Sequence, residues 1–190
     1  LRPAILWNDG RSHAECEELT ARAPRLHTLA GNLAMPGFTA PKLLWVERHE
    51  PEVFARVRSV LLPKDWLRLQ LTGDKVSEPS DAAGTLWLDV AARDWSDALL
   101  DACHLGRVQM PRLVESNQAS GTLRPALARA WGLGDGVVVA GGAGDNAASA
   151  IGIGATQPGD GFISLGTSGV LFVVDSKNDR VMKLQLPSLD

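Results

Sequence analysis

Asp145 and Asn146 are the side chains whose sequence context best suits them to chemistry. They follow a run of small residues, Gly141 to Gly144, and a run of valines precedes that run. Glycines let a backbone turn sharply and let a ligand approach the main chain. A carboxylate held beside exposed backbone N–H groups can accept a proton from a hydroxyl group. A simpler interpretation, that Asp145 only caps a helix, stays open because Asp and Asn are both good N-cap residues.

Two further groups of residues could bind a polar ligand. Asp9 and Arg11 follow a short apolar run, Ala4 to Trp7, where their side chains could contact hydroxyl or phosphate groups. The turn formed by Gly166, Thr167 and Ser168 combines backbone N–H groups with two hydroxyls, which are donors that bind phosphate oxygens. Each group also has a plainer interpretation, the first as a turn with a surface salt bridge and the second as an ordinary hairpin turn.

The glycine-rich loop fits two kinds of chemistry. Residues 142–147 match the G-x-G-x-x-[GA] pattern of dinucleotide-binding folds. Such folds also need an acidic residue at the end of the next strand, whereas the expected strand 162–165 leads into Gly166. Phosphoryl transfer needs an acid that accepts the hydroxyl proton and separate donors for the nucleotide phosphates. Asp145 and the turn at Gly166 supply one of each, so the residues favour phosphoryl transfer.

A strand, a loop and a helix in series must position Asp145. Residues 137–139 have the pattern of a strand buried on both faces, and residues 147–151 that of a packed helix. Residues 176–190 indicate no element, and the six tryptophans are expected mainly in the core, with Trp7 as an exception beside Asn8. The other predicted helices are 12–23, 41–48, a short one from Pro51, 64–71, 95–103 capped by Asp94, and 125–131; the other predicted strands are 4–7, 60–62, 86–89, 113–115, 162–165 and 170–174.

Composition narrows the classes of protein to consider. The chain has 190 residues, of which 45% are hydrophobic and 22% charged, and this suits one globular domain or one domain plus part of another. The net charge of −3 comes without a basic block, so we expect no nucleic-acid partner. Cys16 and Cys103 lie far apart without metal-ligand spacing and are expected to be reduced and buried. The sequence also predicts no membrane-spanning helix and a cytoplasmic location.

Several separate motifs, in order along the chain, resemble the FGGY family of carbohydrate kinases. Residues 37–49, GFTAPKLLWVERH, resemble the family's first signature through Thr39, Lys42, Trp45 and Glu47. The motifs are most similar to those of the family's members that phosphorylate D-xylulose. The other matching segments are ILWNDGR at 5–11, LLPKDWLRLQLTG at 61–73, SDAAGTLWLD at 80–89, GGAGDNA at 141–147 and SLGTSGV at 164–170.

The resemblance implies an α/β fold of the actin-like ATPase (ribonuclease H-like) type, with two domains and a cleft between them. The chain would hold most of domain I and the first β-hairpin of domain II. Residues 1–154 would form the sugar-binding domain, residues 155–175 would begin the ATP-binding domain, and residues 176–190 would be an unassigned tail. The partners implied are a small sugar and ATP, with Mg²⁺ as the metal that accompanies ATP.

The resemblance also implies roles for the candidate residues. Asp145 would accept the proton of the sugar hydroxyl, and Asn146 would hold the sugar beside it. Asp9 and Arg11 would line the sugar side of the cleft, and the turn at Gly166–Ser168 would contact the ATP phosphates. No residue of this chain is assigned as a metal ligand.

The resemblance further implies that the chain is a fragment. The family's opening strands and most of its second domain have no counterpart in these residues, so we expect the chain alone to be inactive and to self-associate, for example as a homodimer. Two alternatives stay open. The substrate could be another polyol or ketose, such as glycerol, ribulose or fuculose. The protein could also be a sugar-binding regulator without catalysis, although the intact Asp145 argues against it.

Overall fold

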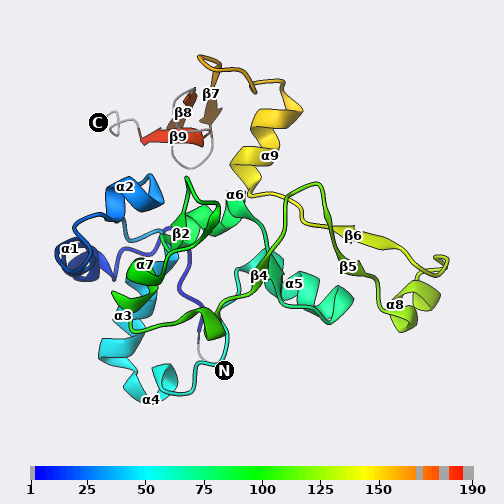
Figure 1. The fold of residues 1–190 in the computed structure, drawn as a ribbon, viewed down its shortest axis with the longest axis horizontal. Coiled ribbons are helices and arrows are strands. Elements are labelled where there is room, and N and C mark those ends of the chain that lie inside the picture. Colours follow the sequence, from blue (N-terminus) through cyan, green and yellow to red (C-terminus); the bar gives the residue numbers. More distant parts are fainter. Residues whose placement is uncertain (1–2, 166–168, 176–179, 186–190) are drawn as a thin grey trace. The chain divides into compact units, whose positions relative to one another are not determined.

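The structure is a computed structural model that describes residues 3–165, 169–175 and 180–185, with side chains for residues 3–164 (Figure 1). The chain divides into two compact units, residues 1–142 and residues 143–190, which are called the first and second unit below. The sequence predicted domains of 1–154 and 155–175. The two units are defined by compactness, whereas the predicted domains are defined by the ligand that each would bind. The predicted boundary near residue 154 therefore stays a prediction.

The helices of the first unit follow the proline and glycine signals of the sequence. Pro51, Pro63 and Pro125 each occupy the first helical position, where a fixed φ suits a helix and a missing N–H costs no bond. The helix from Pro63 stops before Gly73, which adopts a left-handed φ of +94°. The helices are α1 (His13–Arg22), α2 (Leu26–Ala30), α3 (Thr39–His49), α4 (Pro51–Phe54), α5 (Pro63–Thr72), α6 (Pro79–Ala82), η1 (Ala83–Thr85), α7 (Asp97–Asp101), η2 (Arg107–Gln109) and α8 (Pro125–Ala130).

The short strands of the first unit pair with one another, two by two. β1 (Val76–Ser77) runs parallel to β4 (Arg112–Leu113), and β2 (Leu88–Asp89) runs antiparallel to β3 (Asp94–Trp95). β5 (Ala119–Thr122) pairs antiparallel with β6 (Val138–Ala140), with Ala119 opposite Ala140. β6 leads directly into the glycine-rich loop, so its pairing with β5 sets where that loop begins.

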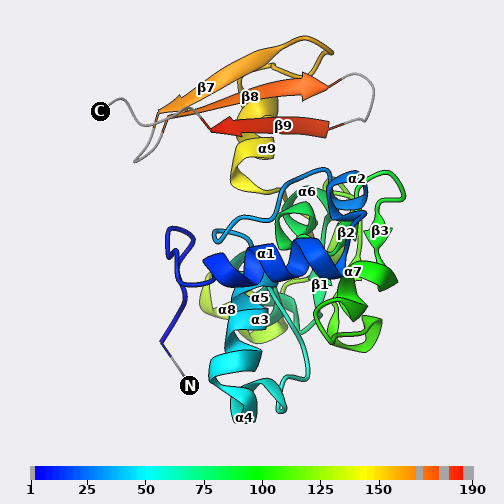
Figure 2. The ribbon, with the colours of Figure 1, turned by 90° about the vertical axis from the view of Figure 1, so that its left-hand side faces the viewer.

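The core of the first unit lies between helices α1, α2, α3 and α7 and the segment around β2. Figure 2 shows α1 crossing over α3, and the two helices pack together. Trp87 and Leu100 have no exposed surface at all, and Leu19 of α1 and Leu44 of α3 are almost as deeply buried. These apolar side chains form one continuous cluster, which fixes the first unit independently of any ligand.

Both cysteines lie in this buried region, as the sequence predicts. Cys16 and Cys103 are free thiols. Burial raises the pKa of each to about 11, so both stay protonated at neutral pH.

In the part of the second unit that the structure describes, there is one helix and an antiparallel sheet. The helix is α9 (Asp145–Gly152), and the sheet has the order β7-β8-β9, shown with its strands side by side in Figure 2. β7 (Gly161–Leu165) pairs with β8 (Gly169–Asp175) so that Leu165 faces Gly169, which confirms the predicted hairpin. β9 (Arg180–Gln185) lies within the stretch for which the sequence indicated no element.

Several of the predicted elements are wrong in type or extent. Of the predicted strands 86–89 and 113–115, only residues 88, 89 and 113 lie in strands. Residues 4–7 are not a strand, because the backbone turns back when the Asp9 N–H donates to the Leu6 carbonyl. Residues 60–62 are extended but unpaired as a strand, and they lead straight into α5. α7 is shorter than predicted and has Ser96 at its N-cap, because Asp94 is already paired within β3.

Burial of the strand 137–139 is also predicted wrongly. β6 pairs with β5 alone among the described strands, and its outer residue Val138 is 60% exposed. Of the tryptophans, Trp87 and Trp95 are buried as predicted, whereas Trp66 and Trp131 are each 56% exposed. A run of apolar residues indicates a capacity for burial, but the neighbouring elements decide whether that capacity is used.

Candidate active site

Asp9 and Arg11 form a close ion pair at the turn that precedes α1. Arg11 Nε lies 2.9 Å from Asp9 Oδ1, Arg11 Nη2 lies 2.7 Å from Oδ2, and the Arg11 backbone N–H also donates to Oδ1 at 3.0 Å. The side-chain hydrogen bonds from Arg11, followed by the backbone bond, lower the pKa of Asp9 to about 2. Asp9 is therefore ionised throughout the neutral range and presents a fixed acceptor for hydroxyl groups.

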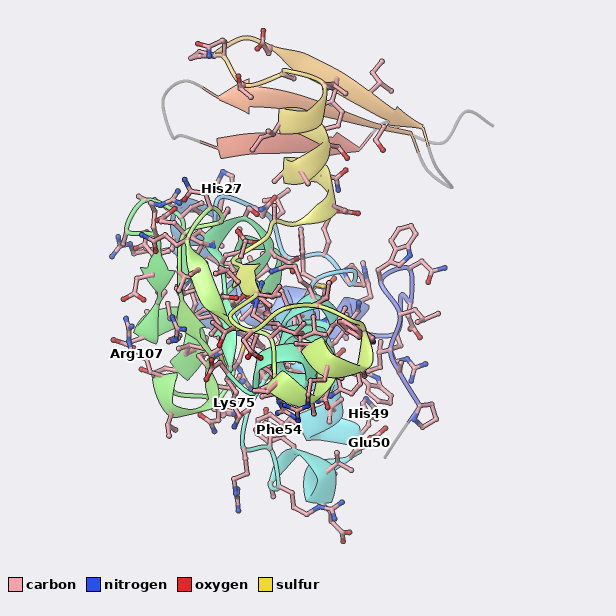
Figure 3. All side chains as sticks on the ribbon, turned by 90° about the vertical axis from the view of Figure 1, so that its right-hand side faces the viewer. His27, His49, Glu50, Phe54, Lys75 and Arg107 are labelled. Carbon is pink, nitrogen blue, oxygen red and sulfur yellow. The ribbon has the colours of Figure 1, made fainter. Side chains whose placement is uncertain are left out.

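A side chain of helix α3 packs against the arginine of this pair. The Arg11 guanidinium lies 4.9 Å from the centre of the Trp45 ring, a cation–π contact, and the same ring stacks on His49 at 4.6 Å between centroids. Figure 3 labels His49 beside Glu50, where α3 ends. The motif around Trp45 thus holds Arg11 in place, and Arg11 holds Asp9.

Lys42 and Gly37 complete the same surface. Lys42 Nζ donates to the Gly37 carbonyl at 2.8 Å. Burial lowers the pKa of Lys42, and the nearby negative charge of Asp9 acts in the opposite direction. A Cβ atom at Gly37 would lie 2.9 Å from the Trp7 carbonyl oxygen, so the turn after Trp7 packs against a backbone without a side chain. The structure therefore joins two sequence motifs that are 26 or more residues apart.

The glycine tract that leads toward Asp145 is fixed by backbone hydrogen bonds. The Gly141 N–H donates to the Gln118 carbonyl at 2.8 Å, and the Gly142 N–H donates to the Ser116 carbonyl at 3.0 Å. A Cβ atom at Gly141 would clash with the Glu115 carbonyl oxygen and would lie 3.1 Å from that of Ser116. Gly142 has a φ of +78°, which favours glycine.

Glu78 organises a buried polar network beside this tract. Its carboxylate has no exposed surface and accepts hydrogen bonds from the Ser80 N–H at 2.8 Å, the Asp81 N–H at 2.9 Å and the Ser116 hydroxyl at 2.9 Å. Burial by itself raises the pKa of Glu78, but these hydrogen bonds outweigh it, so the net effect is a lowered pKa. The ionised carboxylate thereby ties Ser116, a partner of the glycine tract, to the start of α6.

Two cations from α5 complete the network. Lys64 Nζ lies 3.3 Å from Asp65 Oδ1, 3.4 Å from Glu78 Oε1 and 3.5 Å from Asp81 Oδ2. Burial is the largest influence on Asp81 and raises its pKa, partly offset by Lys64. Arg68 lies one turn further along α5 and donates from Nη1 to Asp65 at 3.0 Å. Its Nη2 donates to the carbonyl oxygen of Gly141.

Asp145 and Asn146 lie together at the start of α9. Gly144 is the N-cap residue and Asp145 is the first helical residue, so the interpretation of Asp145 as the N-cap is wrong. Asp145 Oδ1 accepts from the Asn146 N–H at 2.7 Å and from Asn146 Nδ2 at 2.9 Å. Oδ2 accepts no hydrogen bond from the residues that the structure describes, and Asp145 is exposed. Asn146 therefore orients the carboxylate and leaves one oxygen toward solvent.

The remaining site prediction, the turn at Gly166–Ser168, lies outside the described residues. In the part of the chain that is described, no three His, Cys, Asp or Glu side chains gather as metal ligands would. None of the described helices is long and apolar enough to cross a membrane. The pairs Asp9–Arg11 and Asp145–Asn146 belong to different units, and each is characterised by itself.

Sequence reasoning missed the network formed by Lys64, Arg68 and Glu78. A signal for it was present, because Asp65 and Arg68 are spaced i, i+3 and so share one side of a helix. That spacing usually indicates a solvated ion pair. Only the tertiary fold shows that Arg68 retains just 4% of its side-chain exposure and reaches Gly141, 73 residues away.

Comparison with known proteins bears directly on these motifs. Residues 1–152 match the model of the FGGY family of carbohydrate kinases, N-terminal domain. The xylulose kinase of Escherichia coli strain K12 is 60% identical over 174 residues, which cover 92% of this chain and 36% of that protein. The chain thus spans about a third of the length of the curated relatives that it matches.

Solved structures agree with the sequence match. The chain aligns with a crystal structure of a "xyloylose kinase" from Brucella ovis at 59% identity and a TM-score of 0.87, over 92% of this chain and 36% of that one. A xylulose kinase from Rhodospirillum rubrum aligns at 32% identity and a TM-score of 0.83, with the same coverage. The likeness confirms the predicted α/β fold of the actin-like ATPase type. With a family model matched over most of its length, the chain belongs to the FGGY family of carbohydrate kinases.

Proposed function

We propose that the protein carrying this chain transfers the γ-phosphoryl group of ATP to the 5-hydroxyl of D-xylulose, with Asp145 as the proton acceptor. The observation that carries the proposal is the Asp145–Asn146 pair at the start of α9, in a chain 60% identical to a xylulose kinase. Because the chain covers 36% of that relative, the proposal concerns the whole protein.

The proposed step divides the work between a base and binding groups. The hydroxyl oxygen attacks the γ-phosphorus in line, the bond from that phosphorus to the β–γ bridging oxygen breaks, and ADP leaves. The hydroxyl proton passes to Asp145 Oδ2, while Asn146 holds Oδ1. An exposed carboxylate suits this role, because a ligand hydroxyl can come within hydrogen-bonding distance of it.

The other proposed roles belong to the two predicted domains. Asp9 and Arg11 bind sugar hydroxyls as part of a sugar-binding domain of residues 1–154, supported by the surface that Trp45 and Lys42 build under them. The turn at Gly166–Ser168 binds phosphate oxygens of ATP at the start of an ATP-binding domain. Mg²⁺ accompanies ATP in phosphoryl transfer. Among the described residues no three His, Cys, Asp or Glu side chains gather as its ligands would, so no step is routed through it.

The test uses a hybrid protein, because the chain matches about a third of its relatives' length. This chain replaces the matching segment of the Escherichia coli xylulose kinase, and ADP release is measured with D-xylulose, D-ribulose and glycerol. We expect the hybrid to turn over D-xylulose and the 190-residue chain alone to be inactive. A hybrid that prefers glycerol or D-ribulose would keep the kinase chemistry and refute the substrate. A folded hybrid that binds sugar without releasing ADP would indicate a non-catalytic protein.

Substitution of Asp145 tests the base. Asp145→Ala removes the proton acceptor and should lower kcat by a factor of about 100 or more, the usual contribution of a general base. Asp135→Ala is the matched control, because Asp135 is an exposed acid in the loop before β6 with no proposed role. Unchanged turnover by Asp145→Ala would show that another group accepts the proton.

A further inference from the structure

We propose that Arg68 is a positioning residue for Asp145, acting through the backbone of Gly141. The inference rests on the proposed function, since it concerns the group that accepts the proton. The Arg68 Nη2 atom donates to the Gly141 carbonyl, four residues before Asp145 along the chain.

Arg68 is suited to hold a backbone rigidly because three different acceptors fix its guanidinium. Nη1 donates to Asp65 Oδ1 at 3.0 Å within α5 and to the Val76 carbonyl at 2.5 Å at the start of β1. With 4% of its side chain exposed, the group has little room for another rotamer. The planar fork of an arginine can satisfy acceptors in several directions at once, which a lysine ammonium at the end of a flexible chain cannot reproduce.

The backbone on either side of the Arg68 contact is held as well. The Gly141 and Gly142 N–H groups donate to the Gln118 and Ser116 carbonyls, and Ser116 is tied to buried Glu78. Gly141 therefore has both its donor and its acceptor occupied, and its backbone lies so close to the Glu115 carbonyl that an added Cβ would clash with it. The first unit ends at Gly142, so this is its last fixed point before α9.

The path from that fixed point to Asp145 is short. Only Gly142, Ala143 and Gly144 lie between Gly141 and Asp145, and each contributes two backbone dihedral angles. Gly144 is extended, with φ −62° and ψ 149°, and serves as the N-cap of α9. A shift of Gly141 therefore passes to Asp145 through few rotatable bonds. Misplacement of a reacting group by about 1 Å can lower a rate by a factor of about 100.

The experiment compares Arg68→Lys and Arg68→Met with a matched control in the hybrid protein. Arg107→Lys is the control, because Arg107 (labelled in Figure 3) likewise donates to carboxylates and to a backbone carbonyl, that of Trp95, but lies outside this network. We expect Arg68→Lys to lower kcat by a factor of about 100. KM for D-xylulose should stay within a factor of about two, since the Asp9–Arg11 surface is untouched.

A second measurement tests, without an activity assay, whether Arg68 holds the Gly141 backbone; this hold is called the clamp. Hydrogen exchange of the Gly141 and Gly142 amides is followed in the 190-residue chain, alongside its far-ultraviolet circular dichroism. Both Arg68 variants should speed exchange at these two amides while exchange at the core residues Leu99 and Leu100 stays unchanged. The Arg107→Lys chain should exchange like the original at all four.

The outcomes separate the positioning role from the proposed function. If Arg68→Lys keeps full kcat while Asp145→Ala is inactive, the positioning role is refuted and the proposed function stands. If kcat falls only in proportion to the folded fraction, Arg68 has a merely structural role and the inference is equally refuted. If the original hybrid phosphorylates no sugar, the proposed function fails and the positioning role falls with it.

Discussion

Replacing Gly141 with alanine tests directly whether the glycine tract is confined by its surroundings. The added Cβ would clash with the Glu115 carbonyl oxygen and press on that of Ser116, which are backbone atoms and cannot rotate away. Forcing extra atoms into a packed site costs about 1–3 kcal/mol. If the tract moves instead, it loses the bond from Arg68, and a hydrogen bond to a charged group contributes about 1.5–3 kcal/mol.

Either route leads to a similar expected loss, about 1–3 kcal/mol in the free energy of unfolding, because one cost replaces the other. The assay is urea unfolding of the 190-residue chain, followed by tryptophan fluorescence and circular dichroism together. In a thermal melt, a chain of this size should show a melting temperature lower by roughly 2–12 °C. Coincidence of the two probes would confirm that a single transition is being compared.

Gly134→Ala is the control for this measurement. Gly134 precedes the same strand, a Cβ atom there would meet nothing within 4 Å, and its φ is not in the left-handed region. Alanine at such a position should leave the stability unchanged or raise it by about 0.4–1 kcal/mol. If Gly141→Ala were as stable as Gly134→Ala, the close approach of Gly141 to the Glu115 backbone would be wrong, and the clamp inferred for Arg68 would lose its support.

Two further predictions concern the first unit. Hydrogen bonds outweigh burial and lower the pKa of Glu78, so the ionised carboxylate stabilises the fold above the ordinary pKa of 4.5, and this stabilisation is lost as the pH falls through the lower folded pKa. Glu78→Gln should therefore lower the free energy of unfolding at pH 7 by about 1–3 kcal/mol. Urea unfolding of the variant should also show a weaker fall in stability between pH 5 and pH 3. Leu100→Ala, at a core position with no exposed surface, should lower the free energy of unfolding by about 2–5 kcal/mol in the same assay. Val108→Ala, at an 88% exposed position, should change it by less than about 0.5 kcal/mol. Equal effects of the two substitutions would contradict the assigned core.

The helices of the first unit are largely predictable because their limits depend on local chemistry. Pro63 begins α5 and Gly73 ends it through backbone restrictions that act within one or two residues. The strands are less predictable, since a strand exists only where another strand pairs with it. Residues 4–7 have a suitable composition but turn back on themselves, and residues 180–185, which looked featureless, form β9 beside β8.

The candidate site divides along the same line. The ion pair of Asp9 and Arg11 and the pairing of Asp145 with Asn146 join residues one or two apart, so their sequence spacing already brings them together. The support beneath them is not local. Arg11 rests on Trp45 of α3, and Glu78 bonds to Ser116, 38 residues away. Family motifs mark such positions without saying which of them touch.

For the same reason, the sequence indicates only one of the two constraints on the glycine tract. Small residues before an acid suggest room for a ligand, and that inference considers only the exposed side of the loop. The structure adds a second reason at Gly141, where the Glu115 backbone and the Arg68 guanidinium occupy the space around it. A residue that must be small because protein surrounds it is a fixed point, whereas one that must be small to admit a ligand needs only open space. Gly141 is of the first kind, so the three residues between it and Asp145 connect a fixed point of the first unit to the group proposed to react.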